Sequence, residues 1–243
     1  MKSSVMAHLV AHYPSGPASL EVGRELVRAG VSFLEVQFPF SDPTADGPAI
    51  QAACTQALEA GFRVSDGFTL VQGLADGGAV PVFIMTYASV VVSHGVEWFA
   101  ERAARAGASG LIVPDLPPDY DEGLYSAGRA AGLHVVPVLV PSAAPERVEV
   151  ALATRPEYVY AALRKGITGA ATEIGAENIT FLEELKKRGV HVMAGFGIRS
   201  REQVEALHGH ADTVVVGSAF VDVISRQESV SDLARELVSG PAL

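Results

Sequence analysis

The chain has 243 residues, of which 49% are hydrophobic and 19% charged, and its formal net charge is -10. A chain this apolar can bury a large core, which excludes intrinsic disorder. Binding to nucleic acid requires clustered Lys and Arg, and no such cluster accompanies the negative charge. Cys54 is the only cysteine, so a disulfide within the chain is excluded. With no signal peptide or apolar stretch of ~18 residues, we expect a cytoplasmic protein without a membrane segment.

Short apolar runs alternate with segments of helical period along the whole chain, and Gly or Pro stands at the junctions. This alternation predicts eight parallel strands with crossover helices. The expected strands are Val5 to Ala11, Ser32 to Gln37, Val80 to Tyr87, Gly110 to Val113, His134 to Val140, Tyr158 to Ala162, His191 to Ala194 and Thr213 to Gly217. Eight strands in ~250 residues favour a single-domain (β/α)8 barrel over residues 1–243.

The helical segments fall between these strands or after the last of them. They are Gly16 to Gly30, Ala49 to Ala60, Ser65 to Leu74, Val96 to Ala106, Asp121 to Ala131, Pro145 to Ala153, Ile179 to Arg188, Arg201 to His208 and Ser229 to Val238. Four helix-to-strand turns carry Gly where a left-handed cap is needed, namely Gly30, Gly107, Gly132 and Gly189. An open doubly wound sheet is the alternative topology, but no G-x-G-x-x-G follows the first strand.

Glu35 is the first candidate for chemistry, because it lies within an apolar strand and alternates with Leu34 and Val36. It is therefore expected to point into the barrel. A carboxylate there is costly unless it is protonated or paired, and either state suits a general acid or base. A purely structural pairing with Lys or Arg across the barrel is the alternative.

A long loop rich in proline follows the Glu35 strand, and it contains Asp42 and Asp46. Loops of this length usually have a function. Asp46 is the second catalytic candidate, because a stiff loop can carry it over the barrel mouth towards Glu35. The alternative is a turn aspartate before Gly47.

Glycines follow the seventh and eighth strands, where barrels of this kind bind phosphate on backbone N–H groups. Gly197 lies in the first of these turns, and Gly217 with Ser218 in the second. A third glycine-rich turn, residues 164–169, follows the sixth strand and is expected to form a mobile lid. The histidines are scattered, so no metal site is expected.

Several motifs in order along the chain resemble the tryptophan synthase alpha subunit family. The most specific is Leu34-Glu35-Val36-Gln37-Phe38-Pro39-Phe40-Ser41-Asp42-Pro43-Thr44-Ala45-Asp46-Gly47-Pro48, and it is followed by Ile84-Met85-Thr86-Tyr87-Ala88, Asp115-Leu116-Pro117, Gly166-Ile167-Thr168-Gly169, Gly195-Phe196-Gly197-Ile198 and Gly217-Ser218-Ala219. The resemblance covers nearly the whole chain. It implies a lyase that splits indole-3-glycerol phosphate into indole and D-glyceraldehyde 3-phosphate.

The same resemblance implies roles for individual residues. Glu35 and Asp46 match the family's catalytic acids. The family's phosphate binders match Gly169, Gly197, Gly217 and Ser218, and the residues that line its site or lid match Tyr87, Asp115, Tyr160 and Thr168. Arg164 and Gly166 match the lid itself, and Asp42 and Pro39 match the loop that faces the partner. That partner is a beta subunit in an alpha2-beta2 heterotetramer. It carries pyridoxal phosphate, whereas no cofactor is expected in this chain.

The sequence also departs from the family pattern. Gln37 stands where the family has Gly, so it is expected to crowd the barrel mouth or alter its hydrogen bonding. Further departures are Thr44, His12-Tyr13-Pro14, Leu163 and Lys165, and the family's amino-terminal helix is expected to be absent. Two rival functions stay open at this point. One is another phosphate-binding barrel, such as an epimerase or isomerase, and the other is a regulatory barrel that activates a beta partner without turnover of its own.

Overall fold

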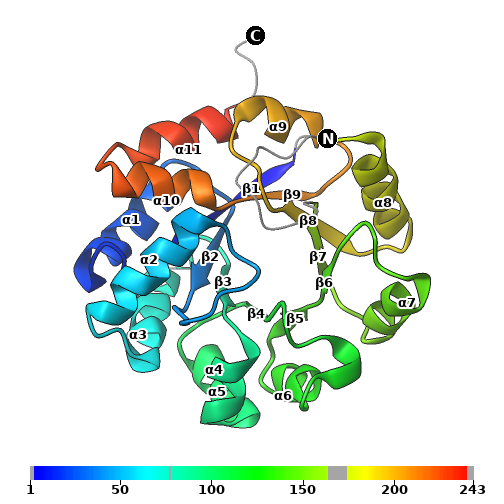
Figure 1. Ribbon diagram of the computed structural model, residues 1–243, viewed down its shortest axis with the longest axis horizontal. Coiled ribbons are helices and arrows are strands. Elements are labelled where there is room, and N and C mark those ends of the chain that lie inside the picture. The colour runs from blue at the N-terminus through cyan, green and yellow to red at the C-terminus, as the bar shows by residue number, and fades with distance from the viewer. Residues whose placement is uncertain (1–2, 77, 164–173, 240–243) are drawn as a thin grey trace.

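The computed structural model describes residues 3–76, 78–163 and 174–239. In them, parallel strands form one sheet in the order β5-β4-β3-β2-β1-β9-β8-β7-β6. The strands are β1 (Ser4–Val10), β2 (Phe33–Gln37), β3 (Val82–Met85), β4 (Gly110–Ile112), β5 (His134–Val136), β6 (Val138–Leu139), β7 (Tyr158–Ala162), β8 (His191–Gly195) and β9 (Thr213–Val216). Because the last strand pairs with the first, the sheet curls into a barrel (Figure 1). The open doubly wound alternative is therefore excluded.

The fifth barrel strand is divided, which is the one difference from the expected set of eight. β5 pairs with β4 and β6 pairs with β7, and only Pro137 separates them. Proline has no N–H for a ladder hydrogen bond. The Pro137 carbonyl still accepts a hydrogen bond from the Tyr160 N–H of β7 at 2.9 Å. Pairing with β4 therefore ends before Pro137, and pairing with β7 begins there. The other seven strands are confirmed within two residues of their expected ends.

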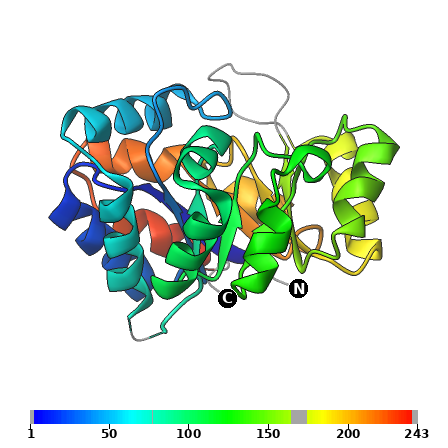
Figure 2. The same cartoon turned by 90° about the horizontal axis from the view of Figure 1, so that it is seen from below.

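The described helices form a ring around the strands (Figures 1 and 2). They are α1 (Gly16–Arg28), α2 (Pro48–Glu59), α3 (Val64–Ala75), α4 (Ala88–His94), α5 (Val96–Arg105), the 3-10 helix η1 (Pro118–Tyr120), α6 (Leu124–Ala130), α7 (Pro145–Ala153), α8 (Ala176–Lys187), α9 (Arg201–Ala206), α10 (Ser218–Ser225) and α11 (Val230–Val238). All nine expected helices are present. The sequence pattern did not predict α4, η1 or α10.

The four cap glycines are confirmed by their backbone angles. Gly30, Gly107, Gly132 and Gly189 have φ values of 98°, 83°, 77° and 78°. Residues with a side chain rarely adopt these left-handed backbone angles. Glycine therefore ends each of these helices and turns the chain back towards the next strand.

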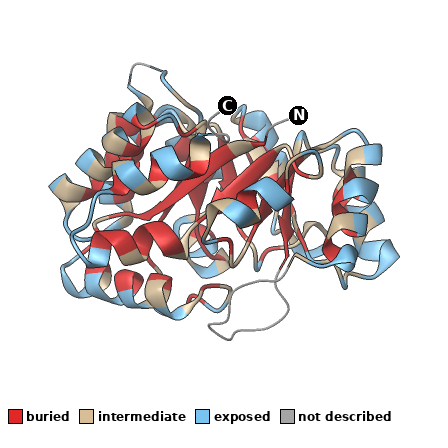
Figure 3. Cartoon of the chain, turned by 90° about the horizontal axis from the view of Figure 1, so that it is seen from above, coloured by how far each residue is buried: buried red, intermediate tan, exposed pale blue. Residues whose placement is uncertain are grey.

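The strands and the helix faces turned towards them are buried (Figure 3). This core has two parts, one outside the strands and one inside the barrel. Leu34 and Val36 belong to the outer cluster, between strands and helices. Inside, the aromatic rings of Phe33, Phe83 and Tyr158 contact one another and fill the end where the strands begin. The opposite end, where the strands finish, is left open for a site.

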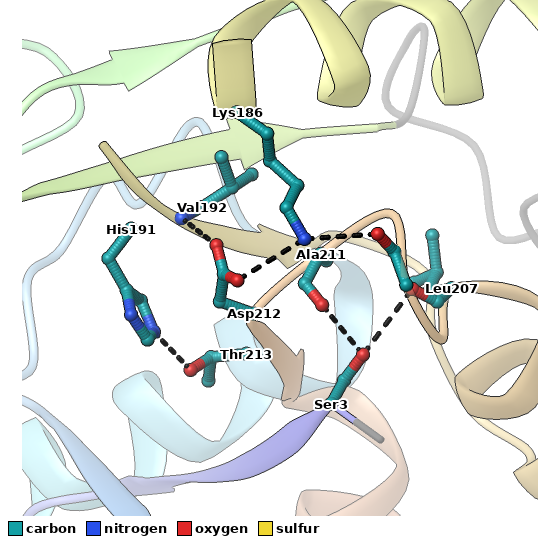
Figure 4. A network of polar contacts seen from close by, with 9 residues as sticks. Ser3, Lys186, His191, Val192, Leu207, Ala211, Asp212 and Thr213 are labelled. Carbon is teal, nitrogen blue, oxygen red and sulfur yellow. Dashed lines mark hydrogen bonds and ion pairs between the residues drawn. The ribbon is translucent and has the colours of Figure 1, made fainter. Parts of the chain in front are cut away.

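A polar network ties the barrel together at the strand-starting end (Figure 4). Asp212 accepts from the Val192 N–H at 2.9 Å and pairs with Lys186 at 3.3 Å. The hydroxyl of Ser3 donates to the Ala211 carbonyl at 2.7 Å. These contacts join α8, β8 and the start of β9 to β1 at the seam where the barrel closes.

Candidate active site

A cavity of about 390 Å³ opens at the end of the barrel where the strands finish. This volume is in the usual range for small-molecule sites. The described residues that line it are His8, Glu35, Thr44, Ala45, Asp46, Gly47, Ile50, Met85, Ile112, Pro114, Val138, Val140, Tyr160, Ala162, Phe196, Gly197, Val215, Gly217 and Ser218. Both candidate acids and three of the predicted phosphate binders therefore lie on one cavity.

Glu35 points into the barrel, as its alternation with Leu34 and Val36 predicted. Its side chain is only 5% exposed, and Oε2 lies 2.6 Å from Nδ1 of His8. No described residue donates to Oε1. The partner is thus a histidine on the neighbouring strand and not the Lys or Arg weighed from the sequence.

His8 is the site residue that sequence reasoning missed. The β1–β2 register places it directly opposite Glu35. Burial opposes its charging, but the hydrogen bond and charge of Glu35, with a smaller effect of Asp46, outweigh burial and raise the pKa of His8. The available signal was a histidine inside an otherwise apolar strand.

Asp46 is buried, and the loop after β2 carries it to the cavity as predicted. Its Oδ2 accepts from the Tyr87 hydroxyl and from Nε2 of Gln37, both at 2.7 Å. Burial raises the pKa of this carboxyl, and His8 and the two hydrogen bonds only partly offset that rise. Oδ1 has no donor among the described residues, so one oxygen of Asp46 stays available to a ligand.

Gln37 lies behind Asp46 and is not among the cavity-lining residues, so it does not crowd the barrel mouth. It alters the hydrogen bonding instead. Its amide donates to Asp46 and lies 3.4 Å from the Cys54 sulfur. Burial and the charge of Asp46 raise the pKa of that thiol to about 12, so Cys54 is neutral.

The glycine turns after β8 and β9 meet on one side of the cavity. Gly197 has φ 85°, and Gly217 precedes α10, whose first N–H groups have no acceptor within the helix. The Ser218 hydroxyl accepts from Arg199 at 3.0 Å, and Arg199 also pairs with Asp222. This cluster offers backbone and hydroxyl donors to an anion.

Tyr160 lines the cavity from β7, as the resemblance implied. Burial and the charges of Glu35 and Asp46 raise its pKa well above the ordinary value, so the phenol remains neutral. A methyl group at Gly195 would lie 2.2 Å from the Tyr160 oxygen. Glycine at this position therefore leaves room for the ring.

Two residues predicted to line the site have other positions. Tyr87 is buried outside the described lining and holds the loop, since its hydroxyl bonds Asp46 and accepts from the Ala45 N–H at 3.1 Å. Asp115 is exposed and accepts from the Ala88 N–H at 2.8 Å, which caps α4.

The residues predicted for the lid and the partner interface differ in where they lie. Asp42 is exposed, whereas Pro39 is buried within the chain. The lid residues lie outside the described part of the structure, and they are Arg164, Gly166, Thr168 and Gly169. Within the described part, no cluster of three or more His, Cys, Asp or Glu could hold a metal ion. No described helix has the length and apolarity needed to cross a membrane.

Fold and cavity together define a (β/α)8 barrel with two buried carboxyl groups and a cluster of backbone and hydroxyl donors at its open end. Comparison with known proteins identifies which barrel it is. The family model of the tryptophan synthase alpha chain matches residues 1–239. The alpha chain of Helicobacter hepaticus is 38% identical over 240 residues, covering 96% of this chain and 90% of that protein.

Solved structures agree with the family match. Tryptophan synthase of Mycobacterium tuberculosis superposes with a TM-score of 0.89 at 34% identity, covering 97% of this chain and 91% of that one. The tryptophan synthase complex of Pyrococcus furiosus superposes with a TM-score of 0.87 at 28% identity, covering 98% of this chain and 99% of that one. This chain belongs to the tryptophan synthase alpha chain family, and it is a lyase of tryptophan biosynthesis.

Proposed function

We propose that this chain cleaves indole-3-glycerol phosphate with Glu35 as acid and base and Asp46 as the residue that holds the indole ring. The family match supports the reaction. The observation that carries the residue roles is that both carboxyl groups line one cavity, each with one oxygen that no described residue uses.

The chemistry follows from the charge that develops on the ring. Glu35 protonates indole C3, which turns the ring into an electron sink. The bond from C3 to the glycerol carbon then breaks and its electron pair returns to the ring, while the hydroxyl on that carbon loses its proton to Glu35. The two transfers cancel, so Glu35 ends in its starting state. The ring is its own electron sink, so this proposal requires no cofactor in the chain.

Asp46 acts on the opposite side of the ring through its free oxygen. Oδ1 accepts the indole N–H, and its negative charge stabilises the cationic ring that forms after protonation. Tyr87 and Gln37 occupy Oδ2 and hold the carboxyl in place. Gly197, Gly217 and Ser218 bind the phosphate at the other end of the substrate, and the family resemblance assigns Gly169 the same role.

A beta subunit is the expected partner, and it would receive the indole. The solved Pyrococcus furiosus relative is described as a tryptophan synthase complex, which supports an alpha-beta assembly here. The exposed Asp42 and its loop would face that partner. We place the assembly in the cytoplasm, in keeping with a chain that has one cysteine.

Indole release from indole-3-glycerol phosphate tests this function, measured with and without a beta subunit. Glu35→Gln should lower kcat by ~10²–10⁴-fold, the range for a general acid or base. Asp46→Asn should lower it by ~10²–10³-fold, because the developing charge loses its counter-charge. Glu183→Gln, at a half-exposed glutamate paired with His210, is the matched control and should keep wild-type rates. Substrate binding without indole release under any condition would instead favour the regulatory barrel.

A further inference from the structure

The strongest unassigned feature of the molecule is the buried pair between His8 and Glu35. Nδ1 and Oε2 are 2.6 Å apart, and the two side chains are 3% and 5% exposed. Register pairing between β1 and β2 puts both on the inward face of the barrel, where both line the cavity. The proposed acid-base residue therefore has a titratable partner in direct contact.

Charge in the cavity depends strongly on this pair. None of the described lining residues is Lys or Arg, so His8 is the one among them that can carry a positive charge near neutral pH. Two other titratable groups face the pair, namely Asp46 from the loop after β2 and Tyr160 from β7. Behind Asp46 lie Tyr87 and Cys54, which both stay neutral.

The second nitrogen of His8 is also informative. Nε2 is buried and has no partner among the described residues. A buried polar atom without a partner is costly, and such atoms in native structures call for an explanation. Within the described structure, the hydrogen bond to Glu35 is thus the polar contact that orients the imidazole, and reciprocally the imidazole orients Glu35.

We propose that His8 is a positioning residue for Glu35, and that its Nδ1–H donates to Oε2 across the 2.6 Å contact. This hydrogen bond holds Oε2, so Oε1 is the oxygen that carries the proton to the substrate and takes one back. Glu35 must lose and regain a proton in each turnover, and the imidazole stabilises the carboxylate that exists between the two transfers. The catalytic effect of His8 rests on the proposed reaction. The coupling between His8 and Glu35 does not depend on that reaction.

The coupling can be measured without any substrate. Titration of the His8 imidazole by NMR, in the wild-type chain and in Glu35→Gln, reports it directly. In Glu35→Gln, His8 loses its hydrogen bond to the carboxylate but stays buried, so the midpoint of its NMR titration should fall to lower pH. A midpoint that stays the same in Glu35→Gln would overturn the inference. His210, paired with the half-exposed Glu183 at 3.1 Å, is an internal reference that should not move.

The catalytic consequence is tested by two variants of His8. His8→Phe keeps a ring of similar size but removes both nitrogens, and it should lower kcat roughly 10- to 100-fold, part of the ~10²–10⁴ that a general acid-base group supplies. Its KM should change by less than about twofold. The alkaline limb of its pH–rate profile should move to higher pH, because the first step uses Glu35 as an acid and the donor that stabilises its carboxylate is lost. His8→Asn retains a donor near the position of Nδ1, so it should recover much of the lost kcat. His210→Phe is the matched control and should behave as wild type.

The outcomes separate the two proposals. Wild-type kcat and an unshifted pH profile in His8→Phe would show that the pair is only structural and would overturn the inference, leaving the proposed function intact. No indole release by the wild-type chain would overturn the proposed function and the catalytic part of the inference together. The NMR midpoint would then still decide whether the pair is coupled. Thermal unfolding of each variant confirms that it is folded.

Discussion

Tyr87→Phe is the sharpest test of how the loop after β2 is held in place. The change removes only the hydroxyl, which donates to Asp46 at 2.7 Å and accepts from the Ala45 N–H at 3.1 Å. A hydrogen bond to a charged group contributes ~1.5–3 kcal/mol, and the amide loses its acceptor as well. We expect a loss of about 2–3 kcal/mol in the free energy of unfolding. For a chain of this size that is roughly 4–12 °C in Tm.

Thermal and urea unfolding measure the loss, and a double-mutant cycle with Asp46→Ala assigns it to the pair. The coupling free energy should be at least about 1 kcal/mol, the scale of groups in direct contact. Tyr120→Phe is the matched control, because Tyr120 is 74% exposed and should change stability by less than about 0.5 kcal/mol. A stability loss for Tyr87→Phe no larger than this control, with no coupling to Asp46, would refute the reasoning.

The same hydroxyl should influence the pH dependence of the protein. Burial raises the pKa of Asp46 above its value in the unfolded chain, so the folded state binds its proton more tightly. Stability contributed by Asp46 is therefore fully present below the unfolded pKa near 4 and is lost as pH rises through the higher folded value. Because the Tyr87 bond lowers the pKa of Asp46, Tyr87→Phe should extend this loss to higher pH. Unfolding measured between about pH 4 and 7 checks the direction.

Three further variants test separate parts of the structure. Gly195→Ala should push the Tyr160 ring out of the cavity wall and raise KM, whereas Gly175→Ala, which meets nothing within 4 Å, should not; steady-state kinetics of both variants decide this. Ser218→Ala should weaken inhibition by inorganic phosphate and raise KM severalfold, because one donor to the anion is lost; an unchanged inhibition constant would contradict the phosphate site. Asp212→Ala removes the acceptor of the Val192 N–H and should lower the free energy of unfolding by about 1–3 kcal/mol, with KM unchanged. A calorimetric Tm equal to wild type would show that this seam does not stabilise the barrel.

Much of the architecture follows from local rules that a sequence displays. Period-two alternation around Glu35 placed its side chain inside the barrel, since successive residues of a strand face opposite sides. Gly30 and its three counterparts marked the helix ends, because only glycine adopts positive φ without cost. The glycine turns at Gly197 and Gly217 predicted donors at the barrel mouth, and both line the cavity.

Contacts between distant segments needed the tertiary structure. His8 and Glu35 are 27 residues apart, and they meet because the β1–β2 register sets them opposite each other. Tyr87 is 41 residues from Asp46, and it reaches that loop from the end of β3. Register and loop path are set by packing of the whole barrel, so no local pattern predicts such pairs. The sequence alone determined which carboxyl groups face the cavity, and the folded chain decided which partners hold them there.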